Sequence, residues 1–75
     1  MKLWLVVRTD YEDMGYDESH GFVIRAESDM SARKIASESC GDEGTKVWLE
    51  MGTCSCTQLT EKGPEGVMLR DYLAG

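Results

Sequence analysis

The sequence predicts a small α+β domain with the element order ββαβββ, in which one helix packs on one face of an antiparallel-rich sheet. Two observations carry this prediction. Several short segments show strand-like alternation or β-branched and aromatic runs, and one central stretch repeats small and apolar residues at helical spacing. With 75 residues the chain can bury one core, so we expect a single domain over residues 1–75.

The first two strands are expected at residues 2–8 and 21–26. The run 2–8 is Lys-Leu-Trp-Leu-Val-Val-Arg, whose apolar side chains at both alternating positions are typical of an interior strand. Alternation in the run 21–26 places three apolar side chains on one face: Phe22, Ile24 and Ala26. The intervening residues 10–20 carry five acidic residues, no Lys or Arg, and Gly15, which predicts a solvated loop.

A helix is expected to begin at Ser28 or Asp29 and to run to about Cys40. Either Ser28 or Asp29 can cap it, because each offers a side-chain oxygen to the free amides of the first turn. Small and apolar residues recur at helical spacing in this segment: Ala32, Ile35, Ala36 and Ser39. Gly41 and Gly44 mark its end.

Three further strands are expected at residues 45–51, 54–60 and 66–72. In the first of these, apolar and polar side chains alternate from Lys46 to Met51. The other two flank the turn-forming run Lys62-Gly63-Pro64-Glu65-Gly66 and are expected to form a hairpin. A right-handed crossover through the helix would place the strand 45–51 beside the first strand, which stays central.

The apolar content exceeds what one thin helix can cover. The helix-facing core is expected to hold Leu3, Leu5, Val7, Phe22, Ile24, Val47 and Leu49. Four apolar residues are then left on the other face of the sheet: Trp4, Val6, Val23 and Trp48. An exposed apolar face marks an interaction site, and a self-complementary one forms a twofold homodimer. The alternative is that the terminal segment folds across this face with Val67, Leu69, Tyr72 and Leu73.

Charge restricts the classes of partner. Fourteen acidic and eight basic residues give a net charge of −6, which repels nucleic-acid phosphates and anionic membranes. We therefore expect no direct nucleic-acid or membrane binding, and a protein partner with a basic surface instead. The apolar run 3–7 is too short for a signal peptide or a membrane span, so we expect a cytoplasmic protein. Three cysteines without a secretory context predict reduced thiols.

No metal or other cofactor is expected. Cys54 and Cys56 would share one face of a strand, and with Cys40 and His20 they reach the four ligands of a zinc site. The last two ligands lack the paired spacing of such sites. A calcium loop beginning at Asp10 fails as well, because Met14 and Gly21 fall on its fifth and twelfth positions.

Catalysis is not expected either. The single histidine, His20, has no nucleophile motif around it. The run Gly41-Asp42-Glu43-Gly44 carries acids where a phosphate loop needs amides or a lysine. A chain of this size also has little volume for a cleft.

The segment from Asp10 to His20 is the leading candidate for binding a protein partner. It exceeds the two to five residues of a simple hairpin loop, and aromatic residues interleave with its acids. The predicted partner-binding residues are Asp10, Tyr11, Glu12, Asp13, Tyr16, Asp17 and Glu18, with Trp4 and Trp48 on the sheet. Clustered carboxylates repel one another unless a basic partner compensates. The competing interpretation is a merely solvated connector.

Several runs resemble small accessory proteins encoded by bacteriophages. They are Tyr16-Asp-Glu18, Gly21-Phe-Val-Ile-Arg-Ala-Glu-Ser28, Ser31-Ala-Arg-Lys-Ile-Ala36, Gly41-Asp-Glu-Gly44 and Gly66-Val-Met-Leu-Arg-Asp-Tyr-Leu-Ala-Gly75. The likeness extends over most of the chain and includes no motif of known chemistry. It implies a phage origin more than an activity, and phage proteins of this size are commonly stoichiometric binders of host or phage proteins, including inhibitors of host defence.

Two other interpretations stay open. In the first, a dimer groove lined by Trp4, Trp48 and one of Arg8, Arg25 or Arg70 captures a small anionic ligand or a nucleotide. In the second, the chain is an enzyme subunit that needs other chains. The sequence by itself identifies neither partner nor ligand.

Overall fold

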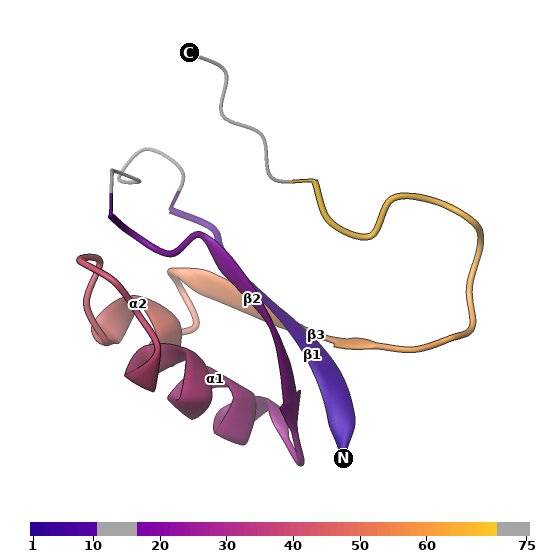
Figure 1. The fold of residues 1–75 in the computed structure, drawn as a ribbon, viewed down its shortest axis with the longest axis horizontal. Coiled ribbons are helices and arrows are strands. Elements are labelled where there is room, and N and C mark those ends of the chain that lie inside the picture. The colour runs from indigo at the N-terminus through magenta and orange to yellow at the C-terminus, as the bar shows by residue number, and fades with distance from the viewer. Residues whose placement is uncertain (11–16, 71–75) are drawn as a thin grey trace.

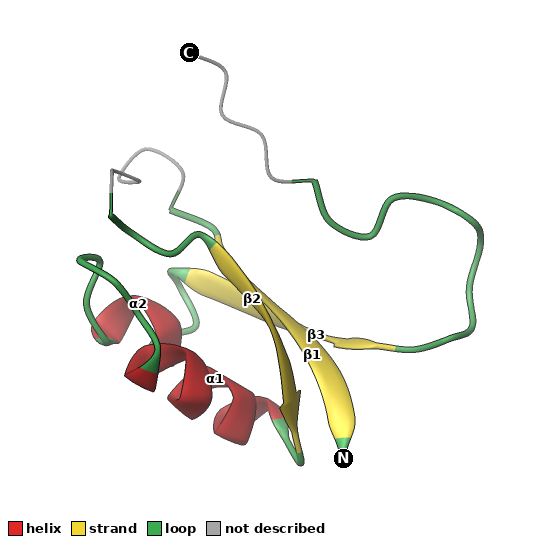
Figure 2. Ribbon diagram, in the orientation of Figure 1, coloured by secondary structure: helices red, strands yellow, loops and turns green. Residues whose placement is uncertain are grey.

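The computed structural model describes residues 1–10 and 17–70 (Figure 1). Its elements are β1 (Lys2–Arg8), β2 (Gly21–Ala26), α1 (Asp29–Glu38), α2 (Lys46–Leu49) and β3 (Cys54–Leu59). Figure 2 shows the two helices together on one side of the strands. The protein is therefore a mixed α+β fold built on a three-stranded antiparallel sheet.

Strand β1 lies in the centre of the sheet, in the order β2-β1-β3. It pairs antiparallel with both neighbours, so that Val6 lies opposite Phe22 on one side and Cys56 on the other. The strands predicted at residues 2–8, 21–26 and 54–60 are thus confirmed, as is the central position of the first.

Helix α1 begins where the capping residues predict. The hydroxyl of Ser28 accepts a 3.2 Å hydrogen bond from the amide of Ser31, which satisfies one free donor of the first turn. Ala32 and Ala36 are fully buried. Their small side chains let the helix pack closely on the sheet.

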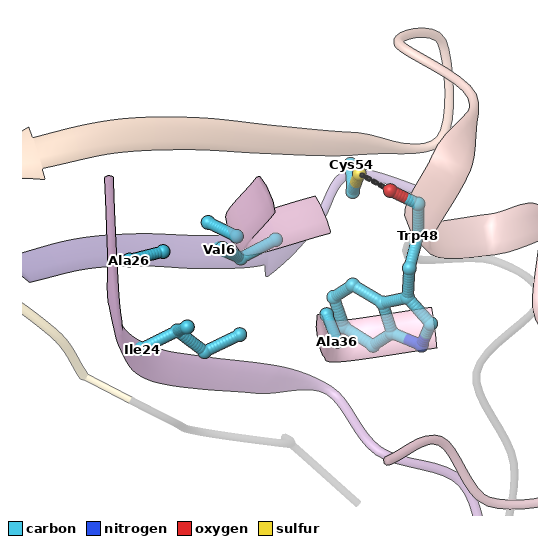
Figure 3. Close-up of a cluster of buried hydrophobic side chains, with 7 residues drawn as sticks. Val6, Ile24, Ala26, Ala36, Trp48 and Cys54 are labelled. Atoms are coloured by element: carbon cyan, nitrogen blue, oxygen red, sulfur yellow. Dashed lines mark hydrogen bonds between the residues drawn. The ribbon is translucent and has the colours of Figure 1, made fainter. Parts of the chain in front are cut away.

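The strand predicted at residues 45–51 is wrong, because this segment contains the short helix α2. The amide of Glu50 donates to the carbonyl of Lys46 at 3.0 Å, which closes one helical turn. That turn places the indole of Trp48 in the core, where it is 0% exposed (Figure 3). Alternation over so few residues cannot separate a strand from one turn of helix, and burial of the indole decides between them.

The second half of the predicted hairpin is not formed in the described residues. Residues 66–70 belong to no strand and are exposed, and positions 71 and 72 lie outside the described range. In Figure 1 the segment after β3 arcs away from the body on the side of the sheet away from the helices. The described part of this segment therefore does not fold across the uncovered face.

The two faces of β1 are reversed relative to the prediction. Trp4 and Val6 face the helices, because they pair with Ile24 and Phe22, whose shared face was predicted correctly. The uncovered face carries Leu3, Leu5, Val7, Val23 and Leu59. Residues 2–8 are apolar at both alternating positions, so pairing with β2 decides the orientation and the sequence of β1 does not.

Candidate functional site

Arg8, at the end of β1, closes the base of the acidic loop. Its Nε and Nη2 donate to the two carboxylate oxygens of Asp10 at 2.8 and 2.7 Å, and its Nη1 donates to Oε1 of Glu18 at 2.7 Å. The Arg8 side chain is only 2% exposed. One guanidinium therefore ties together both ends of the segment that connects β1 to β2.

The hydrogen bonds of Arg8 shift pKa values at the base of the acidic loop. Hydrogen bonds from the Arg8 side chain hold the pKa of Asp10 below its usual value, although burial acts in the opposite direction. The pKa of Arg8 is raised, first by its hydrogen bonds to Asp10. Arg8 and Asp10 are therefore both charged at neutral pH. Two of the five loop carboxylates are thus compensated within the chain, which corrects the expectation that only a partner could balance them.

Glu43 anchors the second end of the loop. Its Oε1 accepts hydrogen bonds from the amides of Ser19 and Gly41, both at 2.9 Å, and its Oε2 accepts one from the indole nitrogen of Trp48 at 2.7 Å. Burial alone would raise the pKa of Glu43, but these three hydrogen bonds, together with one from its own backbone amide, outweigh burial and lower the pKa. The carboxylate therefore stays charged and joins the loop, the turn after α1 and the core.

A backbone contact brings the same two segments together. The amide of Asp42 donates to the carbonyl of Asp17 at 2.8 Å. A side chain at Gly41 would place its Cβ 2.3 Å from that carbonyl oxygen, so glycine is required there. Asp17 has a φ of 59°, a left-handed conformation that aspartate tolerates better than most residues. The return path of the loop is held at Asp17, Glu18 and Ser19.

Acidic groups gather at this end of the sheet. The described members are Asp10, Asp17, Glu18, Asp42 and Glu43, and the sequence adds Glu12 and Asp13 between them. Of the described members, Asp17 and Asp42 are exposed. They present negative charge to solvent beside the compensated pairs of Arg8.

The predicted binding residues divide into three groups. Asp10, Asp17 and Glu18 lie together at the loop base. Four lie outside the described residues: Tyr11, Glu12, Asp13 and Tyr16. Trp4 and Trp48 do not lie on the uncovered face where they were predicted.

Both tryptophans belong to the helix-covered side. Trp48 is fully buried and packs edge-on against Phe22, with ring centroids 4.9 Å apart. Trp4 is half-buried, and its Nε1 donates to the carbonyl of Ala26 at 3.0 Å. Their indoles therefore stabilise the fold.

Sequence reasoning missed Arg8 and Glu43 as organising residues. Arg8 had a usable signal, since a basic residue two positions before Asp10 ends a strand that leads into an acidic segment. Glu43 had none. Its partners Ser19 and Trp48 meet it only through the tertiary fold.

The residues expected to line a ligand groove between two copies do not lie together within the single chain. The guanidinium of Arg8 is occupied by two carboxylates, and the indole of Trp48 is buried. Arg25 is exposed on the opposite face of the sheet from Trp4, because alternate strand residues face opposite sides.

The cysteines are free thiols. Cys54 is 2% exposed, and its Sγ lies 2.8 Å from Nη1 of Arg33 and 3.4 Å from the carbonyl of Trp48. Burial raises the pKa of the Cys54 thiol. Within residues 1–10 and 17–70, no three His, Cys, Asp or Glu side chains gather in a way that could hold a metal ion.

Neither helix of the described chain has the length and apolar character needed to cross a membrane. No family model, curated protein or solved structure matches the chain.

Proposed function

We propose that this protein is a non-enzymatic binding module that occupies a protein partner through the segment from Asp10 to His20. The observation that carries the proposal is the closed base of this segment, where Arg8 bonds both Asp10 and Glu18. A loop whose ends are fixed before binding loses less conformational entropy when a partner orders it. The anchoring of Ser19 by Glu43 acts in the same direction.

The chemistry of the site favours binding over catalysis. A general acid or base works best with a pKa near the operating pH, whereas the pKa of Asp10 and that of Glu43 are lowered. Their oxygens are already engaged in hydrogen bonds with Arg8, Ser19, Gly41 and Trp48. These groups serve as fixed negative charges.

The partner is expected to present a basic surface. The exposed carboxylates of Asp17 and Asp42 lie at the loop base, and Glu12 and Asp13 occupy the intervening sequence with Tyr11 and Tyr16. Such a charge pattern speeds encounter with a Lys- and Arg-rich surface and makes binding sensitive to salt. A phage-type accessory protein acting on a host protein in the cytosol is the setting we propose, on the strength of the sequence resemblance.

A matched pair of variants tests the proposal. The loop variant Glu12→Gln/Asp13→Asn and the control Glu38→Gln/Glu50→Gln, at two exposed positions outside the loop, each remove two negative charges, so both change the net charge from −6 to −4. Each protein is immobilised, exposed to a bacterial lysate and eluted with increasing salt, and retained proteins are quantified by mass spectrometry. We expect proteins that the parent and the control retain and the loop variant loses. Equal retention by all three proteins would contradict the proposal.

A further inference from the structure

The face of the sheet opposite the helices, which we call the open face, is apolar and carries no acid. Its aliphatic residues are Leu3, Leu5, Val7, Val23 and Leu59, and its polar residues are Arg25, Ser55 and Thr57. Val23 is 57% exposed and Leu3 is 40% exposed. Although the chain has fourteen Asp and Glu residues, none lies at these strand positions, all of which the structure describes.

A second apolar surface is present on residues 60–70, which we call the C-terminal arm. Every residue of the arm is exposed, and Val67, Met68 and Leu69 are exposed by 81%, 66% and 47%. The arm leaves the sheet after Leu59, which pairs with Leu3 at the rim of the open face. It then extends on the side of the sheet away from the helices (Figure 1).

We propose that the open face is a homodimer interface, in which two copies pack their open faces together and the arm of each copy lies along the other. Each copy of the chain carries one open face and one arm, so a dimer contains two of each. A single twofold arrangement therefore covers them all. This proposal is independent of the partner bound by the acidic loop.

The open face alone is too small for a stable dimer interface, which is why the arm takes part in the proposed dimer. A sheet of three strands about 4.8 Å apart and seven residues long, at about 3.3 Å per residue, offers a face of only about 330 Å². A stable interface needs about 800 Å² from each partner. Eleven exposed arm residues can span about 35 Å when extended. The arms therefore supply the area that the two faces lack.

Charge distribution selects one orientation of the twofold axis. The end of the sheet near Arg8 carries the acidic loop base, whereas Lys2 and Arg25 lie near the other end. A twofold axis that lies between the two sheets and perpendicular to their strands makes the strands of the two copies run in opposite directions. The acidic end of one copy then lies over the end that carries Lys2 in its partner. An axis along the strands would stack the two acidic ends, which repel within the screening length of about 8 Å at physiological salt.

Sedimentation equilibrium of the full chain over a range of concentrations tests the dimer. Val23→Lys puts a charge on the open face, on β2 opposite Leu5, and Val67→Ser/Met68→Ser/Leu69→Ser removes the apolar surface of the arm. Met30→Lys is the matched control, because Met30 is 78% exposed on α1 and its substitution changes the net charge by the same amount as Val23→Lys. Circular dichroism checks that each variant is folded.

We expect a dimer that Val23→Lys weakens by about 100-fold, that the arm variant weakens by about 10-fold or more, and that Met30→Lys leaves unchanged. Both lysine variants lower the net negative charge by the same amount, so weaker association of Val23→Lys alone cannot come from the change in overall charge. A strictly monomeric parent would overturn the proposal. In that case, hydrogen exchange shows whether its own arm is protected on the face or the face awaits another protein. A dimer that neither interface variant weakens would overturn it as well.

Discussion

The indole Nε1 of Trp48 and Oε2 of Glu43 are joined by a 2.7 Å hydrogen bond that connects the hydrophobic core to the acidic loop. The other oxygen of Glu43 accepts from the amides of Ser19 and Gly41. A single carboxylate thus links the largest buried side chain to the backbone that returns from the loop. The core and the proposed recognition segment therefore share one stabilising group.

Glu43→Gln should lower the free energy of unfolding by about 1–3 kcal/mol, because an amide cannot replace the charged acceptor toward all three donors. An amide group brings a donor of its own close to the indole N–H of Trp48. Urea denaturation at neutral pH measures the change. Glu50→Gln is the control, since its exposed side chain should contribute little. Equal stability of the two variants would refute the linking role of Glu43.

Stability should fall in acid. The pKa values of Asp10 and Glu43 are lowered in the folded protein from ordinary values of 3.8 and 4.5. Their contribution is therefore complete above those ordinary values and is lost as the pH falls through them toward the folded values. Urea midpoints between pH 6 and pH 3 measure the loss, which should be smaller in Glu43→Gln. A midpoint that stays constant over this range would contradict the assignment.

Arg8→Leu should destabilise the protein by about 2–4 kcal/mol, because it leaves Asp10 and Glu18 close together without their shared cation. Arg8→Lys should cost less, since it keeps the charge and loses the bidentate geometry. Thermal and urea unfolding of both variants provide the comparison. If Arg8→Leu unfolded at the same urea concentration as the parent, the closed loop base would be energetically unimportant.

Trp48→Ala should cost about 3–5 kcal/mol, which is enough to unfold much of a domain of this size. The reason is that the indole is 0% exposed and packs against Phe22. Met51→Ala is the control, because Met51 is 83% exposed and should contribute little. Circular dichroism and urea titration distinguish the two. A folded Trp48→Ala protein of parental stability would show that the tryptophan lies on the surface, as its alternation with polar neighbours predicted.

The local signals in the sequence were sufficient for β1, β2, α1 and β3, whereas the strand predicted at residues 66–72 is not formed in the described residues. Alternation gave the common face of Phe22, Ile24 and Ala26, and Ser28 marked the start of α1. They were insufficient for the segment around Trp48, where one turn of helix and a short strand show the same pattern. The orientation of β1 also depends on pairing with β2, a contact between residues distant in sequence.

The sequence predicts where the candidate site lies along the chain, but it does not predict the hydrogen bonds that organise the site. The acids of the loop are visible in the sequence, and Asp10, Asp17 and Glu18 do lie together. Their internal compensation by Arg8 and the anchoring of Ser19 by Glu43 depend on tertiary geometry. Charge counts alone therefore overstated the need for an external cation.

Site-specific photo-crosslinking tests the proposed function most directly. Tyr11 is replaced by p-benzoylphenylalanine, an aromatic residue that bonds covalently to nearby proteins under ultraviolet light, and the variant is expressed in bacterial cells. The same residue in place of Met51, which is 83% exposed, serves as the control. We predict a discrete adduct from position 11 that is absent from position 51 and is lost in the Glu12→Gln/Asp13→Asn background. Equal adducts from both positions, or none from position 11, would contradict recognition through the acidic loop.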